Sequence, residues 1–272
     1  MRKQRPGNQD EQEYEAMSDE NKAFLKTTRN MYDIQERDPR FDKEGQITVD
    51  LPGLPHFIIK KMVYSPEHVS VSMAWPEWIA ERAEGKSFLD MGTGTGIAAI
   101  YVAMHGNPEN VVAADISPAA VANCEENAEQ YELEEPSFRT YESDVFDAIP
   151  EGDKFDTMYW NFPWNAPDQE IEEILEEAGE EADPEKVMQL RAGLDTYYRA
   201  LKKFIKEGKD RLNEGGEIYL FAGQPARHDI IYGEAEKHGY NIEIAAEQEM
   251  DVDIVNITKL RLILYKLTRH EI

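Results

Sequence analysis

A glycine-rich turn between a predicted strand and a predicted helix carries the most specific chemical signal in the chain. It lies within the segment Phe88-Leu-Asp-Met-Gly-Thr-Gly-Thr-Gly-Ile97. Glycine lets a ligand approach the backbone closely, and the first turn of a helix presents N–H groups that have no partner within the helix. We therefore expect a nucleotide-like ligand at this turn. The alternative is a tight turn that needs glycine for packing alone.

The spacing of these glycines narrows the class of ligand. A dinucleotide-binding turn has the pattern Gly-x-Gly-x-x-Gly, but here the third glycine comes one residue early and Ile97 stands in its place. A phosphate-binding loop requires Gly-Lys-Ser/Thr, and no lysine lies between Ser87 and Arg139. Since both phosphate-binding patterns are absent, the expected ligand is a nucleoside without phosphates.

Two acidic residues follow later predicted strands. Asp115 ends a short apolar strand and lies 23 residues past Gly92, where its carboxylate can accept hydrogen bonds from both hydroxyls of a ribose. Asp144 stands in Ser143-Asp-Val145 after a short polar strand, where it can accept from the amino group of an adenine. The Asp144 signal is the weaker of the two, because acidic residues are frequent throughout the chain.

Together these segments resemble the cofactor motifs of class I S-adenosylmethionine-dependent methyltransferases, over roughly residues 64–267. The resemblance implies an α/β fold: a Rossmann-like, mostly parallel sheet of seven strands with the last one antiparallel, and helices on both faces. It also implies S-adenosylmethionine as cofactor and S-adenosylhomocysteine as product. The residues that it assigns to cofactor binding are Asp90, Gly92, Thr93, Gly94, Gly96, Asp115, Ile116, Asp144, Val145 and Asn161.

A second motif, Asn161-Phe-Pro-Trp164, follows a predicted strand. It is similar to the Asn-Pro-Pro-aromatic motif of methyltransferases that modify amide or amino nitrogens. In that family the asparagine and a neighbouring backbone carbonyl accept hydrogen bonds from the attacking NH2 group, and the aromatic ring packs on the substrate. Phe162 replaces the usual proline, which predicts a less rigid loop. The resemblance assigns catalytic roles to Asn161, Pro163 and Trp164.

Candidate substrate-binding residues come from this motif and from the segment that precedes the core. Aromatic faces suit a ligand that carries positive charge, although tryptophans at a strand end can equally fill the core. Upstream, a tyrosine, a glutamate and a histidine are candidates for binding or proton removal, and the histidine can also be an ordinary surface residue. The predicted substrate-binding residues are Tyr64, Glu67, His68, Trp160, Phe162 and Trp164.

Alternating strands and helices must position these residues. We expect an N-terminal extension over residues 1–63, helical around residues 13–32 with a strand or turn pair at 46–62, and a methyltransferase domain over residues 64–272. An acidic insertion at 165–185 is read as a solvated helix or as a lid. The predicted strands cover residues 87–91, 111–114, 155–160, 217–221, 240–246 and 259–267. The predicted helices cover residues 75–83, 96–105, 118–131, 184–212 and 227–238.

The charge of the chain bears on its partners. The net charge is −26, and residues 87–185 carry 25 acidic residues against two basic ones. Proteins that bind nucleic acid gain affinity by neutralising phosphates, so this acidity disfavours nucleic acid and favours a small-molecule acceptor, an amine or a thioether such as methionine. A saline environment is an alternative cause of the acidity. Other hypotheses are an N-methyltransferase of a protein glutamine or amine or of a nucleobase, and a noncatalytic scaffold.

The remaining composition bounds the compartment and the cofactors. The 272 residues are enough for one large domain, and the longest apolar run has eight residues, which predicts no membrane span. The first residues are polar and charged and Cys124 is the single cysteine, which favours a cytoplasmic protein. The six histidines show no metal-ligand spacing, so we expect no metal site. The sequence sets no oligomeric state.

Overall fold

The computed structural model describes most of the chain after the first 34 residues. The described residues are 35, 37–65, 75–177, 179, 181–254 and 257–270. The helix expected around residues 13–32 and the candidate site residues Glu67 and His68 lie outside these ranges. Within them, no helix combines the length and the apolar character that crossing a membrane requires.

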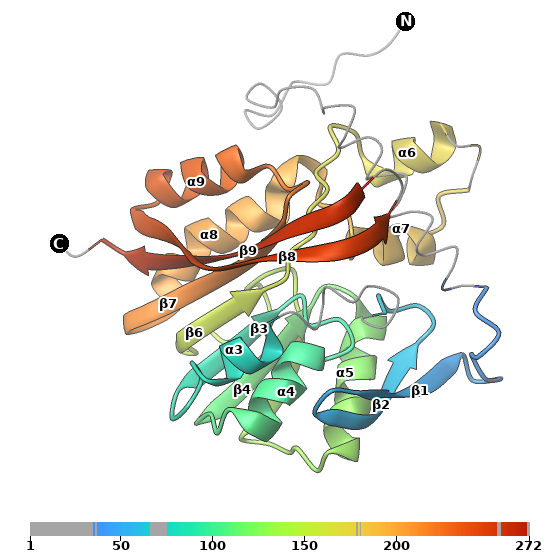
Figure 1. Cartoon of the computed structure of the whole chain (residues 1–272), viewed down its shortest axis with the longest axis horizontal. Helices are drawn as coiled ribbons and strands as arrows, with labels where there is room; N and C mark the ends of the chain where they lie inside the picture. The colour runs from blue at the N-terminus through green and yellow to red at the C-terminus, as the bar shows by residue number, and fades with distance from the viewer. Residues whose placement is uncertain are drawn as a thin grey trace, which may run out of the picture.

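A sheet of seven strands forms the centre of the molecule (Figure 1). Its order is β5-β4-β3-β6-β7-β9-β8, and all neighbouring strands run parallel except at β9, which is antiparallel to both of its neighbours. The predicted α/β fold is thereby confirmed. The strands are β3 (Ser87–Met91), β4 (Asn110–Asp115), β5 (Phe138–Glu142), β6 (Phe155–Trp160), β7 (Leu212–Gly223), β8 (Tyr240–Ile254) and β9 (Ile257–Arg269).

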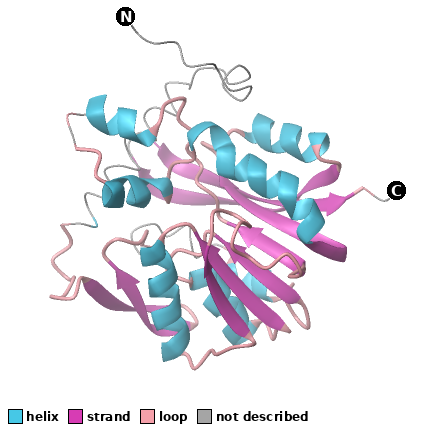
Figure 2. Ribbon diagram, turned by 180° about the vertical axis from the view of Figure 1, so that it is seen from behind, coloured by secondary structure: helices cyan, strands magenta, loops and turns pink. Residues whose placement is uncertain are grey.

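Helices cover both faces of this sheet (Figures 1 and 2). Successive side chains of a strand point to opposite faces, so β3 sends Leu89 and Met91 toward α8 and α9, and Phe88 toward α3, α4 and α5. Two hydrophobic cores result, one on each face. The helices are α3 (Pro76–Ala80), α4 (Ile97–His105), α5 (Pro118–Gln130), α6 (Ile171–Glu177), α7 (Pro184–Arg191), α8 (Arg199–Arg211) and α9 (His228–Lys237), with a 3-10 helix η2 (Thr196–Tyr198).

The strand order reverses between β3 and β6, and this reversal places the candidate site residues together. From β3 the chain continues outward through β4 and β5, then returns to β6 on the other side of β3. Parallel strands bind ligands in the crevice at their carboxyl ends where such a reversal occurs. The glycine turn after β3, Asp115 at the end of β4 and Asn161 after β6 therefore lie at one edge of the sheet.

The helix expected over residues 184–212 is wrong as a single element. The chain leaves α7 after Arg191, and Tyr197 and Tyr198 have φ angles of 56° and 52°, in the left-handed region that a continuous helix cannot contain. Helix α8 begins only at Arg199, where the Asp195 carboxylate accepts from the backbone N–H groups of Ala200 (3.0 Å) and Leu201 (2.9 Å). Capping by this aspartate fixes the new helix start.

A hairpin of β1 (Gln46–Leu51) and β2 (Leu54–Lys60) precedes the seven-stranded sheet and packs on α5. The Asn127 side chain accepts from the Ile58 N–H at 2.8 Å and donates to the Ile58 carbonyl at 2.8 Å and to the Thr95 carbonyl at 2.9 Å. Asn123 accepts from the Lys60 N–H at 2.9 Å and also donates to the Ile58 carbonyl. The two asparagines thus join the hairpin to the helix below the glycine turn.

We predict that Asn127→Ala lowers the free energy of unfolding by about 2–4 kcal/mol, because the buried Ile58 N–H and Thr95 carbonyl lose their partners. Urea unfolding measures the loss. Gln130→Ala is the matched control, since Gln130 also donates to the hairpin, at the exposed His56 carbonyl. Its expected change is within about 0.5 kcal/mol. Equal losses in the two variants would contradict the role given to Asn127.

Candidate active site

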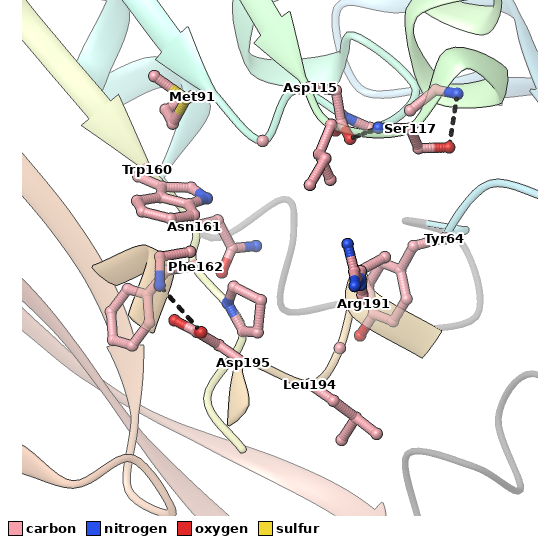
Figure 3. A pocket seen from close by; sticks show the side chains of 18 of the residues that line it. Tyr64, Met91, Asp115, Ser117, Trp160, Asn161, Phe162, Arg191, Leu194 and Asp195 are labelled. Carbon is pink, nitrogen blue, oxygen red and sulfur yellow. Dashed lines mark hydrogen bonds between the residues drawn. The ribbon is translucent and has the colours of Figure 1, made fainter. Parts of the chain in front are cut away.

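A cavity of about 470 Å³ opens at the carboxyl ends of β3, β4 and β6 (Figure 3). One wall comes from the loops that follow these strands. The opposite wall comes from Tyr64 and from α6, α7 and the loop after them, which form a small helical cap with its own hydrophobic core. The buried residues of this core are Ile171, Leu175, Val187, Leu190 and Leu194.

The three glycines of the turn have positive φ angles, and they serve two different purposes. A Cβ atom on Gly94 would meet no protein atom within 4 Å, so this position faces open space in the cavity. A Cβ on Gly92 would lie 2.4 Å from Nε1 of Trp160, and one on Gly96 would lie 2.8 Å from Sγ of Cys124. Gly94 leaves room for a ligand, whereas Gly92 and Gly96 leave room for neighbouring side chains. Gly96 does not line the cavity.

The Asp115 carboxylate connects the ends of two strands. It accepts from the N–H of Gly94 at 2.9 Å and from the N–H of Ser117 at 2.9 Å, one bond to each oxygen. Burial raises its pKa, while the backbone N–H groups oppose that rise. Each oxygen keeps a second lone pair, so the carboxylate can still accept from two hydroxyl groups. Ile116, the next residue, also lines the cavity.

The Asp90 carboxylate is buried beneath the turn. It accepts from the Thr93 hydroxyl at 2.7 Å and from the N–H of Ala99 at 3.1 Å, and both bonds reach the same oxygen. Burial raises the pKa of Asp90 to about 7, because the charged form loses its hydration. Asp90 and Thr93 both line the cavity. Asp90 therefore holds the glycine turn and places a titratable carboxyl group in the wall of the cavity.

The loop after β5 forms one end of the cavity, where Asp144 is exposed and Val145 is buried. Val145 has a φ angle of 56°, a left-handed conformation that strains a β-branched residue. The Ser143 hydroxyl donates to the Val145 carbonyl at 2.9 Å and accepts from the N–H of Ala148 at 2.9 Å. Strained residues of this kind persist only where surrounding contacts hold them.

The loop after β6 directs the Asn161 amide into the cavity, toward the side where Tyr64 and Arg191 lie (Figure 3). Within the described residues, no hydrogen bond is made by the Asn161 side chain, and no group donates to the backbone carbonyl of Phe162. Farther along the loop, the Trp164 carbonyl accepts from the Tyr198 hydroxyl at 2.6 Å and the Asn165 carbonyl accepts from the Asp195 N–H at 2.8 Å. Two hydrogen-bond acceptors therefore remain available beside the glycine turn.

The aromatic residues of this loop mostly belong to the core. Trp160 and Phe162 are 6% and 1% exposed, and their rings meet edge to face, as do those of Phe162 and Tyr198. Trp164 donates from Nε1 to the Phe221 carbonyl at 3.1 Å. The ring of Phe162 thus anchors the loop at the position where a proline was expected to be needed for rigidity. All three aromatic residues and Pro163 still contribute to the cavity wall.

The cap contributes lining residues that sequence reasoning missed. Arg191, Leu194, Asp195 and Thr196 face the cavity from the segment predicted as a continuous helix. Asp195 is buried, which raises its pKa to about 6, and its N–H donates to the Asn165 carbonyl at 2.8 Å. The signal available in the sequence was an aspartate two residues after Gly193, since glycine often follows the end of one helix and aspartate often precedes the start of the next. The acidic insertion, read as a solvated helix or a lid, folds into this cap.

The cavity fits the expected nucleoside cofactor. Gly94 leaves space for close approach, the Asp115 oxygens can each accept one ribose hydroxyl, and both lie between Asp90 and the Asp144 loop. The residues expected to bind cofactor line it, apart from Gly96. Among the residues that the structure describes, no group of three or more His, Cys, Asp or Glu side chains is arranged to hold a metal ion.

Comparison with known proteins identifies the domain. Residues 88–184 match the family model described as a methyltransferase domain. The chain is 42% identical over 66 residues to ribosomal protein L11 methyltransferase of Aquifex aeolicus, and 35% identical over 86 residues to release factor glutamine methyltransferase of Bordetella pertussis. It is 29% identical over 134 residues to ribosomal RNA small subunit methyltransferase C of Actinobacillus succinogenes. The matches cover 24%, 32% and 49% of this chain, but only 26%, 30% and 31% of the relatives.

Solved structures share the fold at low sequence identity. Trm5b of Pyrococcus abyssi has a TM-score of 0.53 at 18% identity, with 84% of this chain and 57% of that chain covered. SMU.776, in complex with SAH, has a TM-score of 0.51 at 16% identity, with 75% and 50% covered. These structures therefore share the fold of this chain. The family model and the curated relatives confirm the enzyme class expected from the sequence, an S-adenosylmethionine-dependent methyltransferase, for the domain that they match.

The expectation of a small-molecule acceptor, with nucleic acid disfavoured, is contradicted by the curated relatives. Their names specify a ribosomal protein, a release factor and a ribosomal RNA as targets. The expectation rested on the charge of residues 87–185, which sums the whole surface of that segment and does not report the charge at the cavity. Three basic residues from beyond that segment, Arg191, Arg199 and Lys203, line the cavity.

We predict that Asp90 makes the folded state less stable as the pH rises. Its pKa of about 7 lies above the ordinary value of 3.8, so its stabilising contribution is complete below about pH 4 and is lost as the pH passes 7. The shift corresponds to about 4 kcal/mol. Relative to Asp90→Asn, the unfolding free energy of the wild type should fall by up to that amount between about pH 4 and pH 8. A difference that stays constant with pH would contradict the raised pKa.

We further predict that Gly94→Val lowers the affinity for S-adenosylhomocysteine at least about 100-fold, because the new side chain fills ligand space. Gly215→Val is the matched control: Gly215 also has a positive φ and no atom within 4 Å of its Cβ position, but it lies in β7 away from the cavity. Both variants bear similar backbone strain. Calorimetry should find near-normal affinity in Gly215→Val, and an equal loss in both would refute the assignment.

Proposed function

We propose that this chain is an S-adenosylmethionine-dependent N-methyltransferase that modifies an amide or amino nitrogen carried by a macromolecule. The observation that carries the proposal is the pair of acceptors beside the glycine turn: the Asn161 side-chain oxygen and the Phe162 carbonyl. A planar NH2 group has two hydrogens, and two acceptors can take both of them. Its lone pair then projects perpendicular to the plane that the acceptors define.

The chain's own residues would orient the reaction. When bound, the cofactor supplies an electrophilic methyl group on a sulfonium, and its transfer is an in-line displacement. Asn161 and the Phe162 carbonyl hold the nitrogen, and the core contacts of Phe162 with Trp160 and Tyr198 keep the loop in place. In intramolecular reactions, orientation of this kind contributes roughly 7–11 kcal/mol. The same acceptors stabilise the positive charge that develops on the nitrogen as the methyl group is transferred. The methylated nitrogen then releases its extra proton to solvent.

The first candidate acceptor is a side-chain amide or amine of a protein in the translation apparatus. Two of the three curated relatives are named for protein targets, a ribosomal protein and a release factor glutamine. A glutamine side chain ends in a planar NH2 group, which matches the two acceptors. The cavity wall formed by the cap and Tyr64 lies opposite Asn161, so such a side chain would lie between the two walls (Figure 3).

The second candidate is the exocyclic amino group of a nucleobase, which presents the same planar NH2. It is favoured by the relative named for ribosomal RNA, whose match covers 49% of this chain. The cations on the cavity wall add to this case, because a polynucleotide requires local positive charge even where the whole chain is acidic. Arg191 faces the cavity from the end of α7 and has no ion pair within the described part of the chain.

The test is methyl transfer from labelled S-adenosylmethionine into ribosomes, release factors and ribosomal RNA. We expect label in one of these macromolecules, and digestion with protease or with ribonuclease then identifies the acceptor class. Asn161→Ala should lower turnover about 100-fold or more while S-adenosylhomocysteine affinity changes little, because Asn161 orients the acceptor nitrogen. Label in small molecules alone, or full turnover in Asn161→Ala, would refute the proposal.

A further inference from the structure

The basic helix α8 contacts the loop that follows β5. Of its cations, Lys203 donates from Nζ to the Asp144 carbonyl at 2.9 Å and lies 2.7 Å from a carboxylate oxygen of Asp147. Farther along the helix, Arg211 donates to the carbonyl groups of Phe146, Ile149 and Pro150. Both cations therefore bind the protein's own loop.

An aromatic contact lies between the two cations. Phe204 of α8 stacks on Phe146 of the loop, with ring centroids 5.4 Å apart and an interplanar angle of 7°. The Arg211 guanidinium lies over the Phe146 ring, 5.4 Å from its centroid. Both phenylalanines are buried. The helix therefore holds the loop at its beginning, its middle and its end.

The beginning of the loop is the part that faces the cavity. Asp144 and Val145 line it together with Lys203 itself. Lys203 approaches the Asp144 side chain as well, at 3.8 Å from a carboxylate oxygen, so the ammonium lies between Asp144 and Asp147. Because Lys203 donates to the backbone carbonyl of Asp144, it fixes the position of the Asp144 backbone. The carboxylates of Asp144 and Asp147 in turn hold the Lys203 ammonium in place.

The strain at Val145 gives this hydrogen bond a specific consequence. A β-branched residue at a φ of 56° relaxes toward negative φ unless its surroundings prevent it. Such a relaxation would turn the Val145 N–H and displace Asp144. In the structure the N–H of Val145 has no acceptor within the described residues, which leaves it available beside the Asp144 carboxylate. One acceptor and one donor, side by side, complement the amino group and the adjacent ring nitrogen of a 6-aminopurine.

We propose that Lys203 is a positioning residue that sets the purine preference of the cofactor site, by holding Asp144 and Val145 in the arrangement that reads a 6-amino group. The inference rests on the proposed function, since it concerns the same cofactor. Lys203 touches no reacting atom. It acts through the Asp144 carbonyl, and Arg211 and Phe204 keep the remainder of the loop in register with it.

The experiment compares two ligands by calorimetry on the full chain: S-adenosylhomocysteine and S-inosylhomocysteine. The second carries an oxygen in place of the 6-amino group and a hydrogen on the adjacent nitrogen, so it presents an acceptor to Asp144 and a donor to the Val145 N–H. We expect the wild type to prefer S-adenosylhomocysteine about tenfold or more, and Lys203→Met to reduce that preference below about threefold. Asp147→Asn, which removes the negative charge of one partner of Lys203, should reduce the preference by a smaller factor.

Lys206→Met is the matched control, because Lys206 is exposed on the same helix and its side chain makes no ion pair or hydrogen bond to the described residues. Lys206→Met removes the same charge as Lys203→Met, and we expect it to keep the full preference for S-adenosylhomocysteine. A wild type that binds neither ligand would overturn the proposed function together with this inference. If the wild type prefers S-adenosylhomocysteine but Lys203→Met keeps that preference, or loses affinity for both ligands equally, the inference alone fails.

Discussion

Two strand-end carboxylates hold the glycine turn in the shape on which the cavity depends. Asp90, at β3, binds the Thr93 hydroxyl and the Ala99 N–H, and Asp115, at β4, binds the Gly94 N–H. A turn of positive φ angles exposes its amide groups, and without these acceptors the buried ones would have no partner. The same bonds keep Gly94 open toward the cavity. Ligand space and the stability of the turn therefore depend on the same two side chains.

The remainder of the site is joined to this turn by packing rather than by sequence proximity. Trp160 fills the space over Gly92, and Phe162 packs against both Trp160 and Tyr198, which places the Asn161 loop against the turn. Tyr198 and Asp195 in turn hold the Trp164 and Asn165 carbonyl groups. Cap, acceptor loop and α8 are thus one connected assembly, in which methyl donor and acceptor can be held in fixed relation.

Much of the fold was predictable because its signals are local. The strands β3 and β6 have the bounds that the sequence predicted, and Ser117 with Pro118 marks the start of α5 by ordinary capping chemistry. The break between α7 and α8 was missed, because the left-handed Tyr197 and Tyr198 are stabilised by tertiary contacts that periodicity does not report. For the same reason Phe162 was expected to loosen its loop, although its burial anchors it. The prediction of the acceptor class was wrong for a different reason. The net charge of a segment does not show where on the surface its charged residues lie.

The central claim is that a phosphate-free nucleoside cofactor lies across the glycine turn, with its reacting end at Asn161. A crystal structure of the chain grown with S-adenosylhomocysteine tests this most directly. We expect ribose hydroxyls on the Asp115 carboxylate, the purine beside Asp144 and Val145, and the sulfur facing Asn161. A ligand bound elsewhere, or a ribose that makes no hydrogen bond to the Asp115 carboxylate, would contradict this placement of the cofactor.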